Sequence, residues 1–399
     1  MRVILIKGQS AYGALPMFVD NLGEAFAQRG YEPIIIDLME GASALAAIKA
    51  EASTGSVALV FTFCILGEYR DEQGRSLSQI FNAPHVVQHV DYPLTQSGRL
   101  DGTAAETALL VVDETHVDAI KSVYGEERFA HVAFSPHAAI GSPTPLEESP
   151  EAFAKSRPIP ILFTGTFYKP VPPPWEKFPS AVKSIFQSAV DRALAVEWMA
   201  ALDALDASLR DGGLDPTAPD IALIRKLATY VHEHVRAHRR YQLLKAAAKV
   251  GLPIHIYGKG YDRQLYRFKN VTFGGEADLQ QAIGLMKQSR VVLNINANFG
   301  AGSHERPLTA LLAGAVGATD YSRFYAAHFV EGREIAIYRW KSLEVDLASI
   351  GALSENPAAA LDMVRAGQPK VAAEHRWSNR VDSILKAADV AKSKMAAAA

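Results

Sequence analysis

Residues 291–324, VVLNINANFGAGSHERPLTALLAGAVGATDYSRF, decide the fold of the C-terminal half of the chain. The apolar run at residues 291–295 predicts a buried strand, and the Gly-rich loop behind it leads through Pro307 into an apolar helix. Residues 315–319 have the composition of a second buried strand. Strand, helix and strand in this order predict one unit of a parallel sheet, with the helix as the crossover connection.

The same alternation of short apolar runs and helical patterns extends along most of the 399 residues. Between the first two runs, Phe18, Leu22 and Phe26 recur at the spacing of one helix face, and Gly30 is suited to end that helix. We therefore expect an α/β protein with parallel, doubly wound sheets. The predicted strands are residues 3–7, 33–37, 57–64, 85–89, 108–112 and 131–134, followed by residues 159–163, 253–257, 271–273, 291–295, 315–319 and 335–338.

The chain is long for one hydrophobic core, and residues 141–157 concentrate Pro, Ser and charged residues as linkers do. The sequence predicts a Rossmann-like domain over residues 1–150 and a second one over residues 156–375. A helical pattern at about residues 175–250 predicts an insertion in the second domain, which is a candidate surface for a homo-oligomer. Residues 376–399 predict a C-terminal helix and tail.

Composition excludes several classes of protein. The formal net charge of −2 gives no overall attraction for a polyanion, so nucleic acid is not expected as a partner. No run approaches the roughly 20 apolar residues of a transmembrane helix. Cys64 is the only cysteine, which excludes an intramolecular disulfide and fits a reducing compartment. We expect a cytoplasmic protein without a transmembrane segment.

The loop and helix start at residues 296–307 contain residue types that bind anions. Glycines permit close backbone approach, and a helix N-terminus offers unpaired N–H groups. Arg306 can contact a phosphate through two N–H groups, and His304 can donate a hydrogen bond or a proton to a leaving oxygen. The spacing equally allows Ser303 to be only a helix cap, with Glu305 and Arg306 as surface charges.

This stretch resembles the C-terminal, donor-binding domain of glycosyltransferases with two facing Rossmann-like domains, the GT-B type, and especially their CgeB-like group. The resemblance is continuous over residues 291–338 and extends more weakly back to residue 159. It implies a GT-B-type fold and a nucleoside diphosphate sugar as donor substrate. The motifs that carry it are Leu293-Asn294-Ile295-Asn296, Ser303-His304-Glu305-Arg306, Ala313-Gly314-Ala315 and Thr319-Asp320-Tyr321.

The resemblance also implies roles for individual residues. The loop and helix would hold the nucleotide diphosphate, Gly165 and Thr166 would approach the same phosphates, and neither a metal ion nor a cofactor would be required. Relatives usually have a Glu for the donor ribose where this chain has Thr309, so either Glu305 replaces that contact or the donor is unusual. The expected donor-binding residues are Gly165, Thr166, Lys259, Gly275, Asn296, Ser303, His304, Glu305, Arg306 and Thr309.

Lys259 and Gly275 belong to two further glycine clusters, at residues 257–261 and 273–276. Each follows a predicted strand, at the edge where open α/β sheets bind ligands. Lys259 could face a phosphate, and the segment around Gly275 is where relatives usually hold the base. Plain strand-to-helix turns explain both clusters equally well, because neither matches the GxGxxG pattern.

In the first domain, Asp91 follows a predicted strand and precedes Pro93 by two residues. Relatives have a similar Asp and Pro beside the acceptor, which supports Asp91 as a catalytic residue that accepts the proton of an acceptor hydroxyl, with His89 or His137 nearby. In the alternative interpretation, Asp91 only shapes the turn and His89 is a core residue.

His232, His234 and His238 lie close together in the sequence but lack the HExxH order of a zinc site. We interpret them as part of a solvated basic helix face, and no metal site is expected.

The sequence thus predicts a hexosyltransferase-type enzyme that transfers a sugar from a nucleoside diphosphate sugar to a hydroxyl of a polysaccharide, protein or small molecule, across a cleft between the domains. Two alternatives stay open: a nucleotide-sugar epimerase of the same fold, and a binding or scaffold protein with a vestigial nucleotide site. The departure at Thr309 favours the second alternative, whereas Arg306 and His304 argue against it.

Overall fold

The computed structural model describes residues 1–167, 172–261, 265–296 and 298–398. The chain divides into two compact units. The first consists of Met1–Ile140 together with Arg376–Ala399, and the second of Gly141–His375. No helix in the described ranges is both long enough and apolar enough to pass through a membrane.

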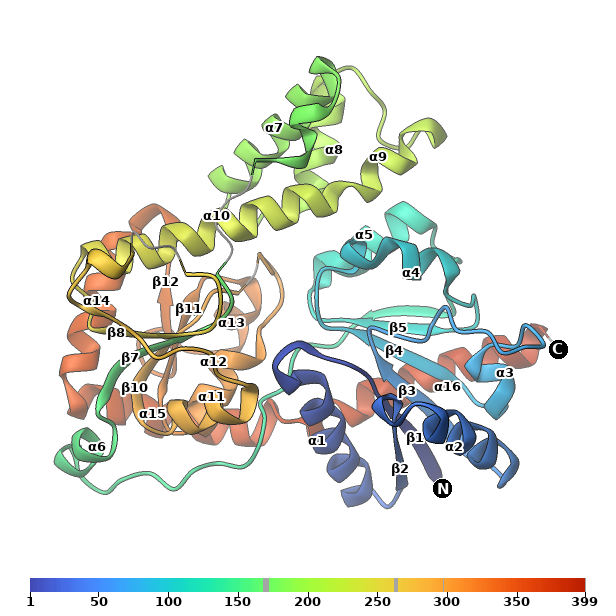
Figure 1. The fold of residues 1–399 in the computed structure, drawn as a ribbon, viewed down its shortest axis with the longest axis horizontal. Helices are drawn as coiled ribbons and strands as arrows, with labels where there is room; N and C mark the ends of the chain where they lie inside the picture. Colours follow the sequence, from blue (N-terminus) through green and yellow to red (C-terminus); the bar gives the residue numbers. More distant parts are fainter. Residues whose placement is uncertain (168–171, 262–264, 297, 399) are drawn as a thin grey trace. The chain divides into compact units, whose positions relative to one another are not determined.

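The first unit is built on a six-stranded parallel sheet with the strand order β2-β1-β3-β4-β5-β6 (Figure 1). Val3, Ile4 and Leu5 of its first strand are fully buried, because a parallel sheet covered on both faces has no solvated side. Its strands are β1 (Arg2–Lys7), β2 (Glu32–Asp37), β3 (Val57–Phe63), β4 (His85–His89), β5 (Ala108–Val111) and β6 (His131–Phe134). Its helices are α1 (Ala14–Gln28), α2 (Ala42–Ser53), α3 (Leu77–Phe81), α4 (Ser97–Gly102), α5 (Glu114–Tyr124) and α16 (Val381–Ala398).

The C-terminal segment completes the first unit. The ring of Trp377 is buried, with its centroid 5.4 Å from that of Phe18 and 5.3 Å from that of Phe63. The Arg380 guanidinium donates hydrogen bonds to the carbonyl oxygens of Pro136 and His137, at 2.9 and 3.0 Å. Helix α16 then packs against β4, β5 and β6.

The second unit has a six-stranded parallel sheet with the order β12-β11-β10-β7-β8-β9. Chain order reverses between β7 and β10, which makes this pair the switch point at which open α/β sheets bind ligands. Its strands are β7 (Ile159–Thr164), β8 (Ile254–Tyr257), β9 (Val271–Phe273), β10 (Ser289–Leu293), β11 (Val316–Asp320) and β12 (Ala336–Tyr338). Its helices are α6 (Pro150–Ser156), α7 (Ser180–Ala195), α8 (Ala201–Asp211), α9 (Ala222–Lys226), α10 (Ala228–Lys249), α11 (Leu279–Met286), α12 (Glu305–Leu312), α13 (Arg323–His328), α14 (Leu343–Glu355) and α15 (Pro357–Glu374).

Helices α7 to α10 make up the inserted segment between β7 and β8, and α7 and α8 lie together on one side of the long helix α10 (Figure 1). Trp175, just before α7, is buried and stacks on Phe186 at 5.6 Å. The insertion therefore has apolar packing of its own.

The prediction of two doubly wound parallel sheets is confirmed, and every predicted strand is present. The ends differ by a few residues. Strand β10 begins at Ser289 rather than at residue 291, because Ser289 already pairs with Ile159 of β7. Helix α1 begins at Ala14, one turn before its predicted start.

Candidate functional site

The loops after β7 and β8 are joined through their backbones beside the switch point of the second sheet. The Gly165 N–H donates to the Tyr257 carbonyl at 2.9 Å, and the Gly258 N–H donates to the Gly275 carbonyl at 2.8 Å. A Cβ atom at Gly258 would lie 2.0 Å from the Gly165 carbonyl oxygen, and Gly258 has a φ of 144°. Only glycine fits here, so the glycines predicted at this edge bring separate loops into one surface.

Arg306 is positioned by a buried amide at the end of the neighbouring strand β10. Its Nη1 donates to Oδ1 of Asn294 at 2.8 Å, and Nδ2 of Asn294 donates to Oγ1 of Thr319 at 3.0 Å. The Tyr338 hydroxyl donates to the Asn294 carbonyl at 2.8 Å. In the described part of the chain, Asn294 is the only acceptor for the Arg306 side chain, so the remaining guanidinium N–H groups are available to a ligand.

A second cation, Arg240 on α10, lies beside Arg306. Its Nη1 donates to the Thr166 carbonyl at 2.5 Å. Burial, reinforced by the nearby charges of Arg236 and Arg306, lowers the pKa of Arg240 to about 10, and the group stays charged at neutral pH. Two guanidinium groups, one bound to the Thr166 carbonyl and the other to Asn294, thus lie near each other, an arrangement that favours a phosphate or diphosphate.

Arg240 was missed in the sequence because its helix was interpreted as a solvated basic face, and that interpretation is wrong. His232 and Arg239 are 3% and 2% exposed. Arg239 donates to the carbonyl of Ala193 on α7 at 2.8 Å and to Oδ1 of Asn298 at 3.3 Å. The reason is tertiary: α7 and the loop after β10 cover this helix, and helical periodicity alone does not show what covers a basic face.

His304, rather than Ser303, occupies the N-cap position of α12. Nδ1 of His304 lies 3.4 Å from the Arg306 N–H and 2.5 Å from Oε2 of Glu305. A contact this short between Nδ1 and Oε2 has a proton between the two atoms, so Nδ1 binds Glu305 and does not accept the Arg306 N–H. Burial lowers the pKa of His304, and the Glu305 carboxylate opposes that effect. Tyr325 of α13 fixes this residue, because its hydroxyl accepts from the His304 N–H at 3.0 Å and donates to the His304 carbonyl at 3.1 Å.

Asn296 shapes the glycine loop that precedes α12. Its Nδ2 donates to the carbonyls of Phe299 and Gly302, at 2.9 and 3.1 Å, and its N–H donates to Oδ1 of Asp320 at 2.6 Å. Ala297, within the same loop, lies outside the described residues. Among the described residues, no donor reaches the buried Oδ1 of Asn296, so this oxygen can accept a hydrogen bond from a ligand or a water.

Thr309 and Lys259 have different surroundings. Thr309 is buried in the middle of α12, so its hydroxyl lies in the interior of the second unit. The Lys259 ammonium lies 2.9 Å from the Glu276 carboxylate, and both side chains are more than half exposed. Lys259 therefore lies on the solvent side of the glycine loops.

The first unit brings Asp91, His89 and His137 to the carboxyl ends of β4 and β6. Asp91 is exposed, and within the described residues its carboxylate accepts no hydrogen bond. His89 and His137 are buried. Burial lowers the pKa of His89 to about 4, so its ring is neutral at pH 7. Asp91 is accordingly the one of the three that presents its titratable group to solvent.

His116 on α5 was missed in the sequence. It is buried, and its ring lies 5.2 Å from that of Tyr92 in an edge contact. Burial lowers the pKa of His116 to about 4, although the charges of Asp113 and Asp91 oppose that shift. A histidine in a helix first turn carries no local signal of function, and only the fold places His116 near Asp91.

Solved structures of low sequence identity match the chain over nearly its whole length. Sucrose-phosphate synthase from Thermosynechococcus elongatus has a TM-score of 0.54 at 13% identity and covers 100% of both chains. Anabaena HepE in complex with UDP and glucose has a TM-score of 0.52 at 11% identity and covers 97% of this chain and 98% of its own. An alpha-glucosyltransferase in complex with UDP-glucose and DNA containing an abasic site has a TM-score of 0.52 at 9% identity and covers 97% of this chain and 99% of its own.

These likenesses, with the two parallel six-stranded sheets, show that the chain has the fold of GT-B glycosyltransferases. Residues 236–386 also match a protein-family model described as "Glycosyl transferase-like". That match includes Arg240 and the whole of α12. No curated protein sequence matches the chain.

Proposed function

We propose that this protein is a metal-independent glycosyltransferase, of the CgeB-like group, that moves a sugar from a nucleoside diphosphate sugar to a hydroxyl acceptor. The observation that carries the proposal is the pair Arg240 and Arg306 at the switch point of the second sheet. HepE and the alpha-glucosyltransferase, which share the fold, were solved with UDP or UDP-glucose, and this supports a nucleotide ligand.

In the proposed reaction, the bond between the anomeric carbon of the sugar and a phosphate oxygen breaks, and the acceptor hydroxyl oxygen bonds to that carbon. Negative charge develops on the departing diphosphate, where Arg240, Arg306 and the N–H groups at the start of α12 stabilise it. The proton of the acceptor hydroxyl passes to Asp91, whose exposed carboxylate can accept it.

Nucleotide binding by Arg306→Ala and Arg240→Ala tests the donor site. Each loss removes hydrogen bonds between charged groups, worth about 1.5–3 kcal/mol, or roughly 10- to 100-fold in Kd. A panel of nucleoside diphosphates and their sugars is titrated into the wild type and both variants by calorimetry, and the melting temperature is followed in parallel. Arg333→Ala is the matched control, because Arg333 is exposed and lies outside the candidate site.

The expected result is binding by the wild type and the control, with the predicted weakening in both site variants. If no nucleotide binds the wild type, or if both site variants bind as it does, the donor site is assigned incorrectly. Product analysis then separates the remaining alternatives. A donor epimer formed without any acceptor indicates an epimerase, and binding without turnover indicates the binding protein that the buried Thr309 favours.

A further inference from the structure

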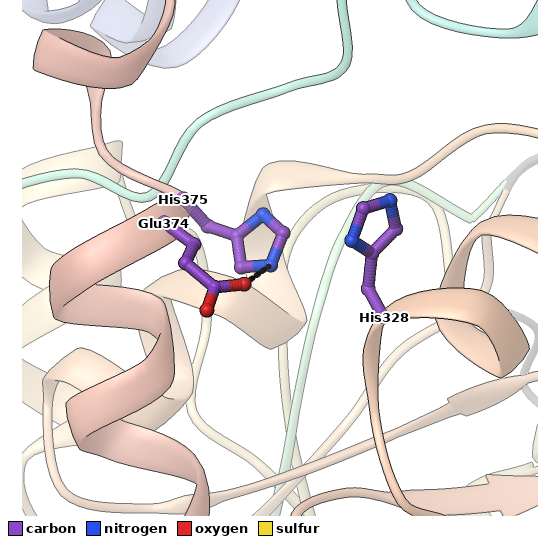
Figure 2. Close-up of side chains that lie close together, drawn as sticks. All are labelled: His328, Glu374 and His375. Carbon is purple, nitrogen blue, oxygen red and sulfur yellow. Dashed lines mark ion pairs between the residues drawn. The ribbon is translucent and has the colours of Figure 1, made fainter.

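Three side chains of the second unit, His328, Glu374 and His375, gather outside the candidate donor site. Each offers one ligand atom, and these atoms all lie within 4.8 Å of one another. Figure 2 shows the two imidazoles and the carboxylate turned toward a common space between the last residue of α13 and the end of α15. In the described part of the chain, this is the only such group of His, Cys, Asp or Glu side chains.

We propose that His328, Glu374 and His375 bind a divalent transition-metal ion of the zinc class. Two imidazole nitrogens and one carboxylate oxygen form a donor set typical of zinc, in which water completes a tetrahedral site. Bond lengths of 2.0–2.1 Å place such ligand atoms about 3.4 Å apart. The Glu374 side chain is exposed and can rotate to close the remaining distance.

Glu374 and His375 are neighbours in the chain, and their ligand atoms lie close together. Oε2 of Glu374 and Nε2 of His375 are 4.0 Å apart, which is too long for a hydrogen bond. Around one tetrahedral ion these two atoms would be about 3.4 Å apart, so a small rotation of the exposed Glu374 side chain would bring both within bonding distance of the same ion.

Aromatic rings hold the two imidazoles in place. The His375 ring is buried and stacks on Phe329 at 5.2 Å, and Phe324 lies 4.5 Å from His328 and 5.6 Å from His375. The two imidazoles are nearly perpendicular, with their centroids 5.3 Å apart. Ligands fixed by packing lose little freedom on binding, which favours a metal over a mobile surface cluster.

The proposed ion lies apart from the candidate donor and acceptor residues, because none of them is among its ligands. It would link the end of α13 to the end of α15. Tyr325, one turn before His328 on α13, holds the backbone of His304. Metal binding would therefore stabilise the second unit at a helix that also supports the start of α12.

Zinc binding to the full chain tests the proposal. The chelator-treated protein is titrated with Zn²⁺ against a chromophoric competitor, and Co²⁺ is added separately to record the visible spectrum of a tetrahedral site. The variants are His328→Ala and Glu374→Gln, whose parent side chains are exposed, so both are expected to fold. Glu355→Gln is the matched control, because Glu355 is exposed at the end of α14 and lies outside the cluster.

The expected result is one Zn²⁺ per chain, a higher melting temperature with Zn²⁺, and wild-type behaviour of the control. Loss of a neighbour of a metal ligand weakens binding by roughly 10- to 100-fold, so loss of a ligand itself should cost at least as much in both variants. The proposal is overturned if the wild type binds no stoichiometric Zn²⁺, or if the double variant His328→Ala/Glu374→Gln binds it as tightly as the wild type.

Discussion

Asp320 shows how burial changes the ionisation of a single residue beside the candidate donor loop. It ends β11, is 3% exposed, and accepts the Asn296 N–H at 2.6 Å. Burial raises the pKa of Asp320 to about 6, although the Asn296 N–H and the charge of Arg239 oppose the shift. The carboxylate is therefore costly to ionise in the folded chain.

Asp320 makes stability fall with rising pH. Its folded pKa of about 6 exceeds the ordinary 3.8, so the folded state binds more protons than the unfolded state between these values. The free energy of unfolding should decrease by about 3 kcal/mol as pH rises through this window. Asp320→Asn keeps an oxygen for the Asn296 N–H and should lose this contribution, as urea unfolding at several pH values will measure.

The exposed Asp362 provides the control for this experiment. Asp362→Asn should keep the pH dependence of the wild type. An unchanged dependence in Asp320→Asn would show that the carboxyl is ionised at low cost, contrary to its buried position.

At the scale of elements, the C-terminal segment, α16 with the residues just before it, packs against the first unit and stabilises it. Trp377, Arg380 and α16 all contact residues of the first unit. Trp377 lies between Phe18 of α1 and Phe63 of β3, so it joins a helix to the sheet. This segment is part of the core of the first unit rather than a tail.

Trp377→Ala should lower the free energy of unfolding of the first unit by about 3–5 kcal/mol, because it removes a fully packed ring and leaves a cavity. Chemical denaturation followed by circular dichroism measures the effect. Trp198→Ala is the control, since Trp198 is 50% exposed and should cost much less. Equal losses in the two variants would contradict the packing role of Trp377.

At the scale of the whole molecule, the first unit contains several buried histidines that are neutral at pH 7. His85, His89 and His116 are buried, and burial lowers the pKa of the first to about 3 and of the others to about 4. In the unfolded chain these groups titrate near their ordinary pKa of 6.5. The unfolded state thus binds more protons than the folded state as the medium becomes acidic.

Acid should therefore destabilise the first unit. The contribution of these histidines to its free energy of unfolding should be complete above pH 6.5 and decrease as pH falls from there toward 4. One histidine with a folded pKa of about 4 accounts for a loss of about 2 kcal/mol at pH 5, so the total loss should be at least that large. Hydrogen exchange followed by mass spectrometry, corrected for intrinsic rates, reports this stability for residues of the first unit alone. Protection that is the same at pH 7 and pH 5 would mean that these histidines are protonated without cost.

The sequence by itself determined the two doubly wound sheets, the strands and the inserted helices, and it singled out the residues at the start of α12 as candidates for anion binding. These features depend on patterns over a few neighbouring residues, such as apolar runs, helix spacing and glycine turns, which physical chemistry links directly to local structure. Arg306 could be singled out because it lies within one such pattern.

Only the tertiary structure decided which distant residues meet. The strands β8, β9 and β10 and the helix α11 separate Arg240 from Arg306 in the chain. Arg240 reaches the same site because α10 passes the carboxyl end of β7. His328 meets Glu374 and His375 in the same way, and residues from Arg376 onward complete the core of the first unit. Such contacts depend on how elements pack in space, and the packing energy that fixes them is shared among many residues far apart in the chain.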